Sequence, residues 1–210
     1  GGKPLPLKNS ENLYFDLPEV AIRVEGEADG QFDDSDYILF YGKGIYGWDD
    51  ENLSHLNVYD ENTYYYVTYG GSAGKRIANL TQPSGNATIN YNSFDERVFH
   101  EKNLVNIGKL SRKWFGEVFN VNNSQNFNFE LTNIVNSEPV FLTTVVAASS
   151  PNNSTFNFSV NNQNIGSVSI SGSTTDFYAN ERYFNESFNL SGTSAVVGIT
   201  FNNNGVPSAN

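Results

Sequence analysis

Apolar and polar residues alternate regularly along the second half of the chain. Apolar residues of one parity form four sets: Phe127, Phe129 and Leu131; Phe156, Phe158 and Val160; Phe184, Phe188 and Leu190; Val197, Ile199 and Phe201. Because successive side chains of a strand point to opposite faces, each set is expected to line one buried face. One buried face per strand predicts two packed sheets. With segments 140–147 and 166–170, the pattern predicts the roughly seven or eight strands of a β-sandwich or jelly roll.

The first half is less regular, but short β-branched and aromatic runs recur between clusters of Asn, Gly, Ser and Asp. These runs predict four strands, over residues 19–25, 37–41, 63–69 and 87–91. The expected fold class is therefore all-β, with a small N-terminal β-domain over residues 1–98 and the sandwich over residues 99–210. We expect the first domain to be incomplete at its start and the second to lack its last strand.

Charge and composition exclude several kinds of partner. The 210 residues carry a net charge of -11, which repels phosphate backbones and anionic lipid, so we expect no nucleic-acid partner. No window resembles a membrane-spanning segment, and the N-terminal residues lack the apolar region of a signal peptide. Any export signal is therefore expected upstream, and no cofactor is expected.

The chain contains no cysteine. Disulfides, thiolate metal sites and a cysteine nucleophile are therefore excluded within these residues. The two histidines, His55 and His100, lie in polar segments, and no strand-turn-helix nucleophile motif accompanies them. We therefore predict no catalytic residue and no enzymatic activity for this chain.

An acidic turn precedes the aromatic run at residues 37–41. It contains Asp29, Asp33, Asp34 and Asp36, and hard cations prefer several carboxylate and carbonyl oxygens from one short loop, so these residues are calcium candidates. The spacing does not fit an EF-hand, and Asp and Gly also form ordinary turns. Both interpretations stay open, and apart from calcium no metal is expected.

Two groups of aromatic residues are candidate contact sites. Tyr64, Tyr65 and Tyr66 are consecutive, so Tyr65 should point away from its two neighbours. Trp114 and Phe115 follow a basic segment. Either group could stack on a sugar or pack against another domain.

Two long motifs carry a family resemblance: Gly26 to Gly47 (GEADGQFDDSDYILFYGKGIYG) and Phe99 to Glu117 (FHEKNLVNIGKLSRKWFGE). In order and spacing, with segments 12–22, 64–77 and 201–209, they resemble the region before the peptidase domain of the Bacteroidetes type IX (Por) secretion sortase, a gingipain-type cysteine peptidase. The resemblance implies an exported protein at the cell surface, associated with the outer membrane. It also implies that the catalytic His and Cys lie in a downstream domain.

From this resemblance we expect a noncatalytic region that supports, positions or regulates a downstream peptidase domain. The parent enzyme would remove C-terminal signals from secreted cargo. Expected partners are that peptidase domain, other type IX secretion components and the C-terminal signal domains of cargo. The alternative is a surface carbohydrate-binding or adhesive β-sandwich module.

Overall fold

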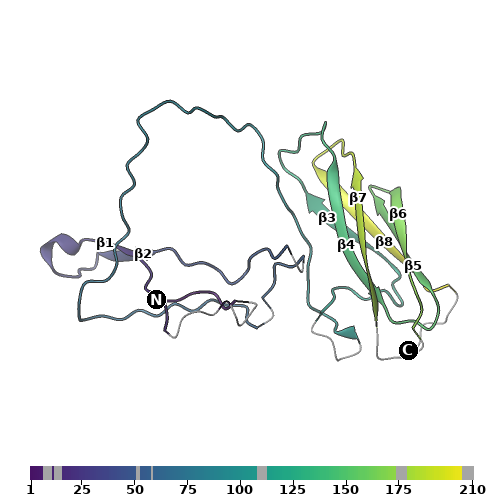
Figure 1. Ribbon diagram of the computed structural model, residues 1–210, viewed down its shortest axis with the longest axis horizontal. Helices are drawn as coiled ribbons and strands as arrows, with labels where there is room; N and C mark the ends of the chain where they lie inside the picture. The colour runs from purple at the N-terminus through teal and green to yellow at the C-terminus, as the bar shows by residue number, and fades with distance from the viewer. Residues whose placement is uncertain are drawn as a thin grey trace. The chain divides into compact units, whose positions relative to one another are not determined.

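The computed structural model describes residues 1–6, 11, 16–50, 53–57, 59–107, 113–173 and 179–204. Within these residues the chain forms β-strands and one short 3-10 helix, so the predicted all-β class is confirmed (Figure 1). None of the described helical structure is long and apolar enough to cross a membrane. The chain divides into two compact units, Gly1–Asn92 and Ser93–Asn210, and each is described by itself. The predicted domain division at residues 98 and 99 stays a prediction.

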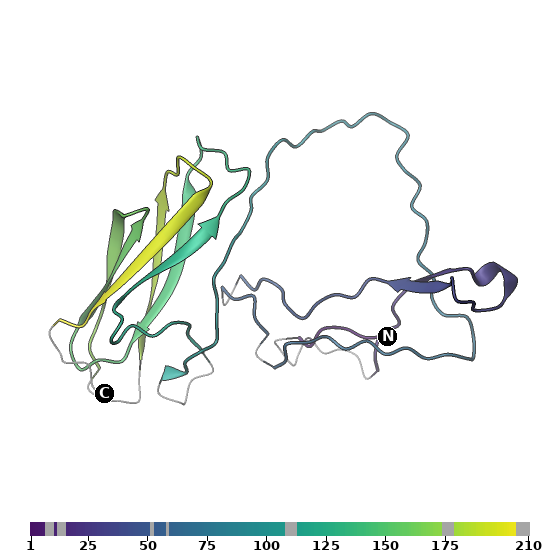
Figure 2. The same cartoon turned by 180° about the vertical axis from the view of Figure 1, so that it is seen from behind.

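The second unit is a sandwich of two antiparallel sheets, seen from opposite sides in Figures 1 and 2. One sheet has the strand order β3-β8-β5-β6 and the other pairs β4 with β7. The strands are β3 (Ser124–Glu130), β4 (Val140–Ala148), β5 (Ser154–Val160), β6 (Gln163–Ile170), β7 (Asn180–Phe188) and β8 (Ser194–Asn202).

The alternation of the sequence predicts the buried faces of these strands correctly. Along β5, residues 154, 156, 158 and 160 are buried, and along β8 the same holds for residues 195, 197 and 199. Each buried side chain removes apolar surface from water. The core therefore consists of the inward parity of both sheets, with partly buried Phe127, Phe129 and Phe188 at its margin.

Two phenylalanines join the sheets at the centre of this core. The rings of Phe158 on β5 and Phe184 on β7 stack with centroids 3.9 Å apart and planes 10° apart. Gly166 of β6 lies against the same ring, with a φ of 144°, and a Cβ atom there would lie 2.9 Å from the Phe184 ring. Glycine is needed here for both its backbone angle and its lack of a side chain.

The predicted number of strands is too high for the described residues. The structure has six strands in the second unit, because the sheet facing the four-stranded one contains only β4 and β7. The periodicity identifies strands that have a buried face, but it does not count the strands of each sheet.

In the first unit, β1 (Ile22–Glu25) and β2 (Tyr37–Phe40) pair along their whole length as an antiparallel hairpin. The helix η2 (Glu27–Asp29) lies between them, flanked by Gly26 and Gly30 with φ of 93° and 77°. Few non-glycine residues adopt such angles, so the glycines permit the turn.

Two of the strands predicted for the first half are wrong. Residues 63–69 contain only a single bridge, between Tyr65 and Gly2, and residues 87–91 form no strand. Strand propensity depends on a partner and on burial, and the residues of both segments are largely exposed. The strand predicted over residues 19–25 is shorter, beginning at Ile22.

The two units differ sharply in burial. Among the described residues of the first unit, Ile45 is the only large apolar side chain that is buried, at 8% exposure. All four residues of β2 are exposed. A two-stranded hairpin is marginally stable in water without a packing surface, so burial of apolar side chains contributes little to the stability of this hairpin.

Replacing Phe158 by Ala should lower the free energy of unfolding of the second unit by about 3–5 kcal/mol, because it leaves a cavity against Phe184. Phe158 is 1% exposed. The matched control is Phe141→Ala on β4, whose side chain is 77% exposed, with an expected change within about 0.5 kcal/mol. Urea unfolding followed by circular dichroism measures both, and equal losses would contradict this description of the core.

Candidate functional site

The acidic turn is closed by its own carboxylates. The backbone N–H of Gln31 donates to Asp29 Oδ1 at 3.0 Å, and that of Asp33 donates to Asp36 Oδ2 at 3.0 Å. The N–H of Asp36 in turn donates to the carbonyl oxygen of Asp33 at 2.9 Å. Two of the four calcium candidates therefore cap the turn.

Within the described residues, no three acidic or histidine side chains are grouped so that they could hold a metal ion. Asp33 and Asp34 are exposed on the turn. Calcium binding at this turn stays a prediction, and the structure supports an ordinary turn role for Asp29 and Asp36.

Arg76 connects a distant segment to this hairpin. Its Nη2 donates to Glu27 Oε2 at 2.7 Å and its Nε to the same oxygen at 3.1 Å. The backbone also pairs, since Ile22 N–H donates to the Lys75 carbonyl and Ile77 N–H to the Ile22 carbonyl, both at 2.9 Å. The hydrogen bond from Arg76 is the main reason why the pKa of Glu27 lies below its ordinary value.

The three consecutive tyrosines differ in their contacts and exposure. The hydroxyl of Tyr65 donates to the Lys43 carbonyl at 2.9 Å, and its ring lies 5.4 Å from that of Phe40. Tyr64 and Tyr66 are both exposed. Tyr65 therefore holds the segment in place, while its two neighbours present their rings to solvent.

The second motif folds as an irregular hairpin with two arms. The N–H groups of Leu104 and Val105 both donate to the Phe115 carbonyl at 2.9 Å, and Phe115 N–H donates to the Val105 carbonyl at 2.8 Å. Phe115 is half-buried beside this pairing, whereas Trp114 is exposed. Of the two predicted contact residues, Trp114 alone presents a large aromatic surface.

Ionic contacts connect the same two arms. Glu117 Oε1 lies 2.9 Å from His100 Nε2 and 3.2 Å from Lys102 Nζ. Burial alone would raise the pKa of Glu117, but the bonds to His100 and Lys102 outweigh it and hold that pKa below its ordinary value of 4.5. The ring of His100 also packs 4.9 Å from that of Phe127 on β3.

Lys113 fixes the second arm to β7. Its Nζ lies 2.6 Å from Glu181 Oε2 and donates to the Tyr183 hydroxyl at 3.3 Å. Burial alone would lower the pKa of Lys113, but these two partners raise it. The sequence analysis missed the roles of Glu117 and Lys113. For Glu117 the available signal was the opposite charge at the other end of the motif, whereas the partners of Lys113 lie outside the motif, on β7.

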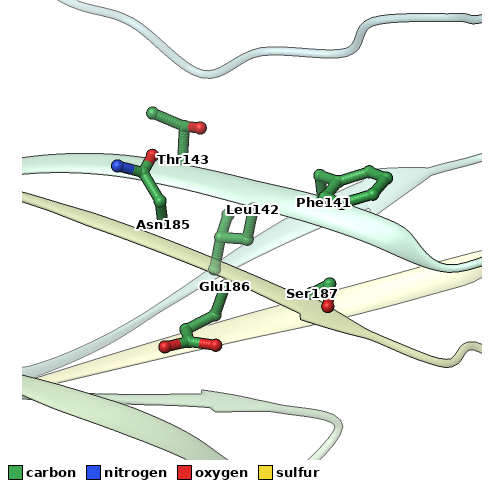
Figure 3. Close-up of a pocket in the computed structure, with 6 residues that line it drawn as sticks. All are labelled: Phe141, Leu142, Thr143, Asn185, Glu186 and Ser187. Carbon is green, nitrogen blue, oxygen red and sulfur yellow. The ribbon is translucent and has the colours of Figure 1, made fainter.

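A shallow groove of about 270 Å³ lies on the β4–β7 sheet. It is lined by Phe141, Leu142, Thr143, Asn185, Glu186 and Ser187. Figure 3 shows Thr143 and Asn185 on one side of the two ribbons and Glu186 on the other. The lining side chains therefore diverge across the sheet, an arrangement that suits surface contact.

Comparisons with known proteins support a fold assignment. No family model and no curated protein sequence matches the chain. It is similar to the solved structure described as dimeric latent PorU from Porphyromonas gingivalis, with a TM-score of 0.64 and 18% sequence identity. The match covers 99% of this chain and 20% of that chain. The predicted resemblance is confirmed at the level of the fold, and the chain spans about a fifth of the length of PorU.

Replacing Glu117 by Gln should lower the free energy of unfolding at pH 7 by about 1 kcal/mol, through loss of charge-assisted bonds. Because the folded-state pKa is lowered, the charge of Glu117 stabilises the fold above about pH 4.5, and this contribution is lost as pH falls through the folded-state pKa. The difference between variant and wild type should therefore shrink in acid.

Unfolding titrations between about pH 3 and 7 would measure this effect. The control is Glu130→Gln, which removes the same charge from an exposed position on β3. A Glu117→Gln deficit that persists unchanged at the acidic end would rule out the ionic explanation.

Proposed function

We propose that this chain is a noncatalytic β-rich region of a cell-surface type IX secretion sortase. In this role it positions or regulates a peptidase domain elsewhere in the same polypeptide. That parent enzyme is a gingipain-type cysteine peptidase that removes C-terminal signals from secreted cargo. The observation that carries the proposal is the fold match along 99% of the chain to one fifth of PorU.

The chemistry of the chain supports a noncatalytic role. A cysteine peptidase needs a thiolate nucleophile, and the sequence contains no Cys. His100, which contacts Glu117 and the Phe127 ring, connects a hairpin to the sandwich. These contacts indicate a structural role for His100.

The surface of the first unit supports a docking role. Tyr37, Ile38, Leu39 and Phe40 all expose between 43% and 51% of their surface, and they occupy both faces of β2. Large apolar side chains exposed on both faces of one strand favour a surface that a partner covers. We infer that the peptidase domain covers this hairpin in the complete protein.

The same proposal includes location and further partners. We propose that the parent protein is exported and associated with the outer membrane at the cell surface. Other type IX secretion components and the C-terminal signal domains of cargo are the proposed partners. The structurally similar PorU is described as latent, which supports a regulatory role beside a positioning one.

A second candidate function is carbohydrate binding, favoured by the exposed side chains of Tyr64 and Tyr66 on either side of Tyr65 in the sequence. Aromatic faces pack against other flat apolar surfaces. Tyr65 fixes the backbone between them through the Lys43 carbonyl. The pair would form a small stacking platform.

The peptidase assignment predicts that the 210-residue chain alone does not cleave a peptide carrying a type IX C-terminal signal. The same chain joined to its downstream sequence should cleave it. In the joined protein, Leu39→Asp should lower the rate by weakening docking, since it places a charge on an apolar contact surface. Val121→Asp, at a side chain 90% exposed, is the control, with no expected effect. Cleavage by the isolated chain would refute the proposal.

The carbohydrate alternative predicts measurable binding on a glycan array. Replacing Tyr64 or Tyr66 by Ala should then lower affinity by about tenfold each, equivalent to ~1.4 kcal/mol. Tyr91→Ala, an equally drastic change at an exposed tyrosine elsewhere in the same unit, should leave binding unchanged. A silent array, or equal losses in all three variants, would eliminate this function.

A further inference from the structure

The outer face of the β4–β7 sheet combines aromatic and uncharged polar side chains. Val146 of β4 and Phe184 of β7 are buried in the core, so the opposite parity of both strands points away from it. Three cross-strand pairs make up this outer face: Phe141 with Ser187, Thr143 with Asn185, and Val145 with Tyr183. Aromatic rings therefore occupy two diagonal corners, and hydroxyl and amide groups lie beside and between them.

The polar groups of the outer face have no partner within the fold. Among the residues that the structure describes, no hydrogen bond reaches the side chains of Thr143, Asn185 or Ser187, and all three residues are exposed. A hydroxyl and a carboxamide can each donate and accept. The outer face therefore offers both donors and acceptors to a ligand.

The outer face is electrically neutral. Glu181 continues the same parity of β7, but its Oε2 lies 2.6 Å from Lys113 Nζ, so this pair neutralises itself. Glu186, which also lines the groove, projects to the other side of the sheet, as Figure 3 shows. A charged ligand would find no counter-charge on this face, whereas a neutral ligand rich in hydroxyl groups would be matched.

The groove of about 270 Å³ lies over one end of the outer face, which supplies four of its six lining residues: Phe141, Thr143, Asn185 and Ser187. Small-molecule sites usually measure about 300–1,000 Å³, so the groove suits one compact chemical unit. The Phe141 side chain, 77% exposed, forms an aromatic wall beside it. Aromatic faces pack well against flat apolar surfaces such as the C–H face of a sugar ring.

Tyr183 provides a second aromatic surface at the far corner. Lys113 Nζ donates to its hydroxyl at 3.3 Å and lies 5.2 Å from the ring centroid, so the ring is held in place while 45% of the residue stays exposed. Four strand positions separate Phe141 from the level of Tyr183, which corresponds to about 14 Å. This separation suits a chain of several sugar rings.

We propose that the outer face of the β4–β7 sheet binds a neutral oligosaccharide. Phe141 and Tyr183 stack on sugar rings at the two ends of the site. The side chains of Thr143, Asn185 and Ser187 exchange hydrogen bonds with the sugar hydroxyls between them. This activity goes beyond the proposed sortase role, and its site lies in the second unit, whereas the tyrosine segment belongs to the first.

A protein surface fits the outer face less well than a sugar does. A covering domain would bury the hydroxyls of Thr143 and Ser187 and the amide of Asn185, and each would need a matched partner to offset its loss of water. A sugar carries hydroxyl groups around every ring and supplies such partners directly. The uncharged, half-polar composition of this face therefore favours the oligosaccharide.

Calorimetry of the 210-residue chain with cellohexaose, maltohexaose, xylohexaose and mannohexaose tests the proposal. At least one of these neutral hexasaccharides should bind. Phe141→Ala should lower its affinity by about tenfold through loss of stacking, and Asn185→Ala by about fivefold through loss of hydrogen bonds. Because both side chains are exposed, neither variant should unfold the sandwich, and circular dichroism would check this.

Two control variants should leave the affinity unchanged. Asn157→Ala removes the same amide from an exposed position on β5, in the other sheet. Tyr64→Ala removes an exposed aromatic ring from the first unit. Amide NMR signals of residues 141–145 and 183–187 should shift on addition of the sugar, and those of residues 154–160 should not.

Three results would overturn the proposal. The first is that none of the four hexasaccharides binds. The second is binding that survives both Phe141→Ala and Asn185→Ala, and the third is binding that Tyr64→Ala abolishes, which would place the sugar on the first unit. None of these results bears on the peptidase assays, so the two proposals can fail separately.

Discussion

The stacked rings of Phe158 and Phe184 are the contact on which the sandwich depends, because they join β5 of one sheet to β7 of the other. The glycine at position 166 lets β6 approach the same ring. With β7 fixed in this way, Glu181 and Tyr183 on its opposite parity are positioned to receive Lys113. The placement of the second motif therefore follows from packing at the centre of the core.

Where a strand buries one face, its sequence was sufficient to predict it. Phe156, Phe158 and Val160 alternate with polar residues because one parity enters the core. The same logic failed for residues 63–69 and 87–91, whose aromatic and β-branched content suggests strands but which have no partner strand along their length. In the first of these segments Tyr65 is partly buried and its hydroxyl is bonded, whereas Tyr64 and Tyr66 are exposed. Contacts such as Glu117 with His100 depend on pairing between arms, which a single sequence does not specify.

The two units differ in how much of their apolar surface they bury. The second buries its apolar parity internally, whereas the first leaves both faces of β2 exposed. The first unit also holds 14 of the 23 acidic residues of the chain but only 6 of the 12 basic ones. The hairpin is apolar and its turn is acidic. This surface is suited to a partner that covers the apolar hairpin and places positive charge opposite the acidic turn.

Contacts within the fold explain most of the charged residues of the second motif. His100 packs on Phe127 of β3, Glu117 joins His100 to Lys102, and Lys113 binds β7, so the hairpin contacts both sheets of the sandwich. These contacts explain why charged residues occupy these positions without invoking a ligand. They do not account for Trp114, which is 48% exposed between Lys113 and the paired Phe115. Because the backbone around Trp114 is already constrained, binding a partner there would cost little further backbone entropy. Trp114 is therefore the residue of this motif best suited to contact a partner.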